Sequence, residues 1–587
     1  MAGRDRQKSA SYYTPEVLTR CLVKYALKEL FKQQLDPLPD DRARAMHLLQ
    51  MTVCEPAMGS AAFLNEAVNQ LSDKYLELMQ SAHGERIPQS EYAGEKQRVK
   101  MYLADHNVFG VDLNPVAVEL AEVSLWLNAL SDDRFVPWFG LQLHCGNSLI
   151  GARRETFPSS SLTVASSSDS HSWLNRAPEK LPMNELLPKG QIWHFLLPDS
   201  GMANYADKVF KERYKTEITA INQWRKEISK KFDRKEIDRL EKLSATIDEL
   251  WQELANQLHK LRERTTDPYN IYGFKDTTHK ATPLEYKDTA LNGELLSKEL
   301  ANTSAYKRLK LVMDYWCALW FWPIDEYQSL PTREEWLFEL ETLLGGDTVG
   351  SMAVGETRGI FSPTQGKLEG EEFVSRFGVM DERVLYKAAP RYKEAGEIAE
   401  SQRFFHWQLE FADIFKQRGG FDLIVGNPPW IKVEWEEAGV LGDTEPMFAV
   451  RKVSATKLSD LREDTFSKYP ELEELWRDEF TGSEATQNYL NAVVNYPQLQ
   501  GQKANLYKCF LPLAWSNGSA QGVSAYLHPD GVFDDPNGGS LRSDIYKRIR
   551  FHFQFVNELK LFSDVGNKDL FGVNTVSYTH LTLPTKA

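Results

Sequence analysis

Residues 421–430 read FDLIVGNPPW, and this stretch constrains the architecture more than any other part of the chain. The largely apolar run FDLIV is typical of a strand buried in a sheet. Two prolines after Asn427 end that strand, because proline has no backbone N–H to donate to a neighbouring strand. The sequence therefore predicts a buried strand that stops at a rigid turn, with Trp430 beside it.

The segments on either side of this strand alternate between strand-like and helix-like patterns. Short apolar runs predict strands at MTVC (51–54), NVFGV (107–111), GVSAYLHPD (522–530) and FQFVNELKLF (553–562). Apolar residues at spacings of three and four predict helices over 14–30, 113–130 and 540–550. This alternation predicts an α/β protein with a mostly parallel sheet covered by helices.

The chain has 587 residues, which is too long for one ordinary domain, so we expect two or three structural units. The αβ pattern occupies 1–150 and 404–576, and a mainly helical insertion occupies 151–403. The insertion begins with the Ser-rich segment 157–173, which we expect to be a flexible linker. Over 205–264 the spacing of apolar residues predicts a helical hairpin or a pair of long helices.

The last residues of the chain, 577–587, fit no pattern upstream and resemble a translated sequencing adapter, so we predict a non-native tail. The net charge of −14 argues against general binding of nucleic acid, although local basic patches decide that question. No apolar run is long enough to span a membrane and the N-terminus lacks a signal peptide, so we expect a cytoplasmic protein with no membrane partner. The five cysteines form no CxxC pair, so we expect neither a metal site nor a disulfide framework.

The first candidate site is the turn in TVCEPAMGSAAFLNEAV (52–68). A strand ends before Glu55 and Pro56, Gly59 permits a positive φ and close approach of a ligand, and an Ala-rich helix follows. The backbone N–H groups at the start of that helix would face a ligand. The alternative is a simple strand-to-helix turn, which every doubly wound protein contains.

The second candidate site is in VFGVDLNPVAVEL (108–120). Asn114 is a natural N-cap and Pro115 suits the first helical position, so Asp112 is not needed to cap this helix. We expect Asp112 to accept hydrogen bonds from ribose hydroxyls, and its alternative role is that of a turn-forming residue. In LHCGNSL (143–149), Asn147 ends a third strand and could contact an adenine edge.

The third candidate site is the turn at Asn427, for which a plain turn is again the alternative. An adenine amino group is a poor nucleophile until acceptors at fixed positions hold its N–H bonds. The side-chain oxygen of Asn427 and the backbone carbonyl of Pro428 can be those acceptors, and the rings of Pro428 and Pro429 make them rigid. Trp430 could stack on a base extruded from the duplex.

Four motifs in this order, YYTP (12–15), EPAMGSAAF (55–63), FGVDLNP (109–115) and VGNPPW (425–430), resemble those of S-adenosylmethionine-dependent DNA adenine-N6 methyltransferases of the gamma arrangement. The resemblance implies a Rossmann-like class I methyltransferase fold with a mixed, mostly parallel seven-stranded sheet. It also implies a cofactor-binding half at 1–150 and a target-adenine half at 404–576.

The resemblance further implies a role for each matched residue. The S-adenosylmethionine would be held by Thr14, Glu55, Pro56, Gly59, Asp112 and Asn147. The target adenine, flipped out of double-stranded DNA, would be held by Asn427, Pro428, Pro429 and Trp430.

FHWQLEFADIF (405–415) is similar to the large methylases of fused restriction–modification enzymes and of the BREX and DISARM phage-defence systems, so other defence subunits are expected partners. The sequence departs from the family at Glu55, where Asp is usual, at Ala61, where the second Gly is usual, and at Asn147, where Asp is frequent. The gamma arrangement places target recognition after the last core strands, so we expect a C-terminal truncation. Two alternatives stay open: a cytosine-N4 or protein-glutamine methyltransferase, and a non-catalytic DNA- or cofactor-binding subunit of a defence complex.

Overall fold

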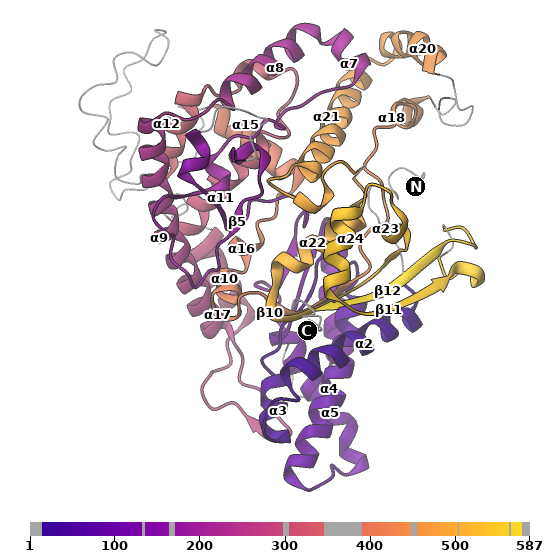
Figure 1. Cartoon of the computed structure of the whole chain (residues 1–587). Helices are drawn as coiled ribbons and strands as arrows, with labels where there is room; N and C mark the ends of the chain where they lie inside the picture. The colour runs from indigo at the N-terminus through magenta and orange to yellow at the C-terminus, as the bar shows by residue number, and fades with distance from the viewer. Residues whose placement is uncertain are drawn as a thin grey trace, which may run out of the picture.

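The sheet has the predicted seven strands. The computed structural model describes residues 14–131, 136–163, 171–296, 304–344, 390–445, 448, 455–502, 504–562 and 565–577. The strands, in spatial order, are β11 (Ile549–Val556), β12 (Leu570–Ser577), β10 (Gly518–Pro529), β9 (Phe421–Gly426), β1 (Val53–Glu55), β2 (Val108–Asp112) and β3 (Leu143–Cys145). All neighbours are parallel except β12, which is antiparallel to both β10 and β11. The predicted mixed, mostly parallel α/β sheet is therefore confirmed (Figure 1).

The order of the strands creates a switch point at the centre of the sheet. The chain runs outward from β1 through β2 to β3, and then returns to the other side of β1 as β9. Val53 of β1 pairs with Val108 on one side and with Leu423 on the other. Ligands of open α/β sheets bind beyond the carboxyl ends of the strands at such a point. The fold therefore predicts a binding site beside Glu55 and Asn427.

The N-terminal helices cover one face of the sheet. They are α2 (Glu16–Gln34), α3 (Asp41–Leu48), α4 (Ala62–His83), α5 (Gln89–His106) and α6 (Pro115–Ala129). Because successive strand residues point to opposite faces, Val53 packs in this core and Cys54 packs in the core of the other face. Figure 1 shows α4 and α5 extending away from the sheet at the lower end of the molecule.

The C-terminal part supplies helices between and beyond its strands. These are α16 (Trp407–Glu410), α17 (Ala412–Arg418), α18 (Glu437–Thr444), α20 (Ala455–Lys468), α21 (Glu471–Asn491), α22 (Leu506–Asn517), α23 (Gly531–Asp534) and α24 (Gly539–Arg548). The sequence did not predict β12, although seven of its eight residues are buried. Ser577, which we assigned to the tail, pairs with Val523 and is 1% exposed, and the start of the tail at residue 577 stays a prediction. Residues 578–587 lie outside the described residues.

The insertion is mainly helical and contains small sheets. Its helices are α7 (Lys208–Arg213), α8 (Lys215–Ile228), α9 (Arg234–Thr265), α10 (Leu284–Leu291), α11 (Ala305–Ala318), α12 (Arg333–Leu344) and α15 (Pro390–Gln402), and its strands are β4 (Glu155–Pro158), β5 (Glu179–Lys180), β6 (Gln191–Trp193), β7 (Asn270–Ile271) and β8 (Phe274–Lys275). The predicted pair of helices over 205–264 is confirmed as α8 and α9. No helix in the described ranges is long and apolar enough to cross a membrane.

The Ser-rich segment is ordered where the structure describes it. Phe157 lies in β4, Leu162 in a 3-10 turn and Trp173 in another, and all three side chains are buried. The prediction of a flexible linker was therefore wrong for 157–163 and 171–173, because apolar residues placed among the serines anchor the segment in the core. Residues 164–170 lie outside the described residues.

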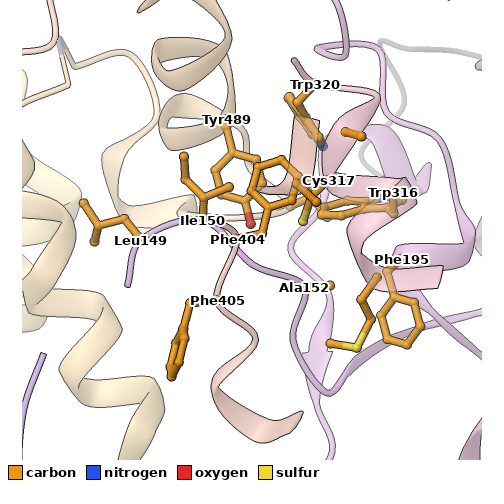
Figure 2. Close-up of a cluster of buried hydrophobic side chains, with 14 of the residues drawn as sticks. Leu149, Ile150, Ala152, Phe195, Trp316, Cys317, Trp320, Phe404, Phe405 and Tyr489 are labelled. Atoms are coloured by element: carbon orange, nitrogen blue, oxygen red, sulfur yellow. The ribbon is translucent and has the colours of Figure 1, made fainter. Parts of the chain in front are cut away.

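The insertion and the second face of the sheet share one hydrophobic core. Figure 2 shows Trp316 and Cys317 of α11 beside Phe404, and Tyr489 of α21 beside Ile150. The hydroxyl of Tyr489 donates to the carbonyl of Gly151 at 2.8 Å. The insertion thus supplies the layer that covers this face of the sheet, while the division of the chain at 150 and 403 stays a prediction.

Candidate functional site

A cavity of about 920 Å³ lies at the carboxyl ends of β1, β2, β3 and β9. The structure brings most of the predicted site residues together along its walls, namely Thr14, Glu55, Pro56, Gly59, Asp112, Asn147, Asn427 and Pro429. Pro428 and Trp430 are not among its lining residues. Segments more than 400 residues apart in the sequence therefore meet at the switch point of the sheet, as Thr14 and Asn427 illustrate.

The turn after β1 has the backbone that the sequence predicted. Gly59 has φ +53°, and Ala61, at the N-cap of α4, has φ 63° and ψ 36°. The left-handed region costs a residue with a Cβ about 1 kcal/mol, so Ala61 tolerates a conformation that would suit glycine better. Ser148 beyond β3 donates to the carbonyl of Pro56 at 2.6 Å, which ties this turn to the neighbouring strand end.

Asp112 fixes the turn after β1 from the end of β2. Its Oδ2 accepts the N–H of Gly59 at 2.8 Å, and its Oδ1 accepts the N–H of Asn114 at 2.9 Å. Asn114 does cap α6 as predicted, by accepting the N–H of Val116 at 3.1 Å. The inference that this cap leaves Asp112 free was wrong, because Asp112 supports both turns. Each carboxylate oxygen still has a second lone pair, which could accept a ribose hydroxyl.

Burial governs the ionisation of the two carboxyl groups at these strand ends. Burial raises the pKa of Asp112, and the N–H groups of Asn114 and Gly59 lower it. Burial also raises the pKa of Glu55 well above its usual range, and this effect outweighs the N–H groups of Phe63 and Leu64 in the first turn of α4. Among the described residues, Oε2 of Glu55 has no hydrogen-bond partner. A cation in the cavity would therefore favour ionisation of both groups.

The side-chain amide of Asn427 has a hydrogen-bond partner at its nitrogen and none at its oxygen among the described residues. Its Nδ2 donates to the hydroxyl of Thr14 at 3.1 Å. Its Oδ1 is buried and has no hydrogen-bond partner in the described part of the chain. A buried acceptor without a donor costs about 1–3 kcal/mol, so Asn427 is prepared to accept an N–H from a ligand.

Trp430 lies beside the cavity and packs against aromatic side chains. Its ring centroid is 4.9 Å from that of Phe562 and 6.2 Å from that of Phe571. Its indole N–H has no partner among the described residues. Its predicted role in stacking on a base stays a prediction. Sequence reasoning missed Phe562, because nothing in its strand-like surroundings indicates contact with Trp430.

Asn147 makes hydrogen bonds mainly to nearby backbone groups. Its N–H donates to the carbonyl of Arg403 at 2.6 Å, and its Oδ1 accepts the N–H of Leu149 at 3.2 Å. The side chain lines the cavity, but its oxygen already stabilises the turn after β3. Contact with an adenine of a cofactor stays a prediction.

Helix α21 forms a wall of the cavity that sequence reasoning missed. It contributes Asp478, Glu479, Gly482, Ser483, Thr486 and Leu490. Burial raises the pKa of the Asp478 carboxyl, and the neighbouring Arg477 lowers it. The acidic side chains of α21 extend the carboxylate lining that begins at Glu55 and Asp112, so the cavity favours a positively charged ligand.

The fold is that of a Rossmann-like α/β methyltransferase, with the site at the switch point of a seven-stranded sheet. Residues 337–461 match the Eco57I restriction-modification methylase family, and this range includes β9 and the turn at Asn427. A protein of Methanocaldococcus jannaschii that carries the name of a type II restriction enzyme and methyltransferase is 23% identical over 188 residues, which cover 26% of this chain. The match covers 15% of that relative's length. The chain is thus similar to methylases of restriction–modification systems.

Proposed function

We propose that this protein transfers a methyl group from S-adenosylmethionine to N6 of an adenine flipped out of double-stranded DNA, within a restriction–modification or phage-defence system. The order of the motifs along the chain supports the gamma arrangement. The similarity to restriction–modification methylases over 337–461 supports DNA as the substrate.

The observation that carries this proposal is the buried, unsatisfied Oδ1 of Asn427 on the wall of the cavity. The hydrogen bond from Nδ2 to Thr14 fixes the orientation of the amide, so that the oxygen is presented before any substrate arrives. An exocyclic amino group brings the N–H donor that this oxygen lacks. Pro428, with a fixed φ, would present its carbonyl as the second acceptor.

The acidic side chains along the cavity support S-adenosylmethionine, a cation, as the cofactor. When bound, this cofactor supplies an electrophilic methyl group on a positively charged sulfur. The carboxylates of Glu55, Asp112 and Asp478 line the cavity and favour a cation. The unused lone pairs of the Asp112 carboxylate would accept hydrogen bonds from the ribose hydroxyls of the cofactor. Gly59 carries no side chain, so the cofactor could approach the backbone of this turn closely.

The residues of the chain orient the substrate and stabilise charge. Asn427 and Pro428 would hold the two N–H bonds of the amino group, so that the nitrogen lone pair points at the methyl carbon. As the new N–C bond forms, the bond from the methyl carbon to sulfur would break and the sulfur would leave as a neutral thioether. The positive charge would then be on the nitrogen next to the oxygens of Asn427 and Pro428, which would stabilise it. The methylated nitrogen then loses one proton to solvent, since a positively charged amine of this kind is acidic.

The test measures transfer of tritiated methyl groups to unmethylated duplex DNA by the full chain, followed by identification of the labelled nucleoside. We expect N6-methyladenine from the wild type and from the exposed control Asn292→Ala, and a loss of at least about a thousandfold in Asn427→Ala. If the label is found in N4-methylcytosine, the substrate is cytosine in place of adenine. If the label is found in protein, the substrate is a protein side chain. Cofactor binding without transfer to any substrate would favour the non-catalytic subunit.

A second measurement separates the two halves of the site. Asp112→Ala should weaken binding of S-adenosylmethionine in calorimetry, because the ribose acceptors and the support of the Gly59 turn are both removed. Asn427→Ala should leave that affinity unchanged. Equal loss of affinity in both variants would contradict this division of roles.

A further inference from the structure

The connection between β11 and β12 carries an exposed tip, residues 558–561, between two buried anchors. Asn557 before the tip and Phe562 after it are buried, whereas all four residues of the tip are exposed. Leu559 is 84% exposed, more than any other large apolar side chain in the described ranges. Single exposed leucines are common on protein surfaces, so the support and the location of this one decide what it can do.

One buried side chain holds the two ends of the tip together. The amide oxygen of Asn557 accepts the N–H of Phe562 at 3.1 Å, and its nitrogen donates to the carbonyls of Phe562 at 2.8 Å and Val565 at 3.0 Å. Lys560 has φ 50°, in the left-handed region, and its N–H donates to the carbonyl of Asn557 at 2.9 Å. Residues other than glycine rarely adopt this conformation. These contacts fix Leu559 at the point of a tight turn.

The tip lies at the edge of the sheet where we place the target adenine. β12 is antiparallel to both β10 and β11, and β9 is parallel to β10, so β11 runs in the same direction as β9. The carboxyl ends of β9 and β11 therefore share the edge that carries Asn427. Phe562 packs against Trp430 there, with ring centroids 4.9 Å apart. Leu559 is three positions from Phe562, so their Cα atoms are at most about 11 Å apart.

The tip offers an apolar side chain rather than a charge. Glu558 precedes Leu559 and Lys560 follows it, and both are exposed, so their charges offset each other. Leu561 is 38% exposed and extends the apolar surface of the tip. Attraction to phosphates requires clustered positive charge, which the tip lacks. Its chemistry fits the flat apolar faces of bases instead.

Extrusion of an adenine from a duplex leaves a space between the two neighbouring base pairs. The faces of these pairs lose their stacking partner, and this loss is part of the free-energy cost of extrusion. Proteins that deform DNA insert apolar side chains, leucine among them, between base steps. A leucine in that space removes its own surface and that of the bases from water.

We propose that Leu559 is a wedge that enters the duplex as the adenine leaves and occupies the space between the neighbouring base pairs. This inference rests on the transfer reaction proposed above and assigns a task to the exposed tip. Asn427 holds the extruded adenine, whereas Leu559 keeps the space in the duplex from closing. Leu559 contacts neither the cofactor nor the reacting atoms, so it is a positioning residue.

Three variants of the full chain test the wedge. Leu559→Ala removes most of the side chain, and Leu559→Met keeps an apolar side chain of similar volume. The matched control is Leu186→Ala, at a leucine of the insertion that is 72% exposed. Because both leucines are exposed, all three variants should fold like the wild type, as circular dichroism and thermal unfolding would check.

The first readout is extrusion of the base itself. The probe is a duplex oligonucleotide with one methylation site, mapped beforehand by labelled transfer, in which 2-aminopurine replaces the target adenine and fluoresces when it leaves the stack. At saturating protein, we expect the equilibrium constant for extrusion to be at least about tenfold lower with Leu559→Ala than with the wild type. Leu559→Met and Leu186→Ala should give values within about twofold of the wild type. On the adenine duplex, kcat of Leu559→Ala should fall by the same factor, with unchanged affinity for S-adenosylmethionine.

A second duplex separates a wedge from a general structural role. It carries an abasic residue opposite the target adenine, and an unpaired base costs less to extrude. Leu559→Ala should therefore transfer methyl groups to this duplex at a rate within about threefold of the wild type. If the variant is equally slow on the paired and the abasic duplex, the wedge is refuted.

The outcomes also separate the wedge from the reaction on which it rests. Equal extrusion by Leu559→Ala and the wild type would overturn the wedge and leave the transfer reaction intact, and the exposed tip would then suit a protein partner. A wild type that transfers methyl groups to no DNA would overturn the reaction and the wedge together.

Discussion

The hydrogen bond between Thr14 and Asn427 joins the segment before α2 to the turn after β9, at the point where we propose that the reaction occurs. Thr14 is 8% exposed, and its hydroxyl accepts a hydrogen bond from the amide nitrogen of Asn427 at 3.1 Å. Thr14→Val removes the hydroxyl without changing the size of the side chain, so the amide can rotate away from its productive orientation. We expect kcat to fall by about tenfold, the equivalent of about 1.4 kcal/mol.

The matched control for this variant is Thr14→Ser, which keeps the hydroxyl. Single-turnover methyl transfer and cofactor affinity should be measured on both. Thr14→Ser should recover most of the rate of the wild type. If Thr14→Val and Thr14→Ser are equally slow, the methyl group of Thr14 rather than its hydroxyl positions the site.

Glu55 gives the protein a dependence of stability on pH. Burial raises the pKa of its carboxyl above the usual value near 4.5. At a pH below that usual value, the group is protonated in both the folded and the unfolded chain. As the pH rises, the unfolded chain loses its proton first, so the free energy of unfolding falls until the pH passes the raised pKa of the folded protein.

Glu55→Gln removes this titration and keeps the shape of the side chain. In the ligand-free protein, the variant should match the wild type near pH 4 and become progressively more stable than the wild type as the pH rises to 8. Denaturant unfolding at a series of pH values measures the difference. The exposed Glu249→Gln on α9 is the control, and a constant difference for Glu55→Gln at every pH would refute this account.

At the scale of elements, the ends of helices and strands that are marked by capping or strand-breaking residues could be predicted from the sequence. Contacts between segments far apart in the sequence could not. Asn114 and Pro115 mark the start of α6, and the glycine and prolines after Val425 mark the end of β9, because caps and breakers act within a few residues. The Gly59 turn was predicted for the same reason. The contact of Asp112 with Gly59 and the cavity wall formed by α21 depend on the packing of distant segments, which no local pattern encodes.

Helix α21 offers a direct test of its role as a wall of the cavity. Gly482 lines the cavity, and a Cβ added there would meet nothing within 4 Å. Gly482→Ala should therefore stabilise the protein by up to about 1 kcal/mol through helix propensity alone. Gly482→Leu should fold equally well, but its side chain would project into the cavity and weaken binding of S-adenosylmethionine by at least about tenfold. Calorimetry that gives the wild-type affinity for Gly482→Leu would show that the ligand does not approach α21.

At the scale of the whole molecule, the insertion and the sheet pack against each other over a shared core. Their side chains form one continuous core, so removal of the insertion would expose an apolar face of the sheet. The ion pair between Arg262 of α9 and Asp413 of α17 crosses this junction at 2.6 Å, and Asp413 is 1% exposed. Arg262 also lies over the ring of Phe109 in β2, with its guanidinium carbon 5.4 Å from the ring centroid. A single charged side chain thus contacts the insertion, the C-terminal part and the first half of the sheet.

Arg262→Met should destabilise the whole molecule, because it leaves the carboxylate of Asp413 buried without its cation. Since Arg262 is 24% exposed and water reaches part of the pair, we expect a loss of about 2 kcal/mol rather than the larger cost of a fully buried pair. Asp413→Leu combined with Arg262→Met should recover much of this loss, since apolar side chains can replace a buried ion pair.

If the insertion and the sheet unfold together, Arg262→Met will shift one cooperative transition in denaturant unfolding, detected both by tryptophan fluorescence and by circular dichroism. Two separate transitions, with only one of them shifted, would show instead that the insertion folds as an independent domain.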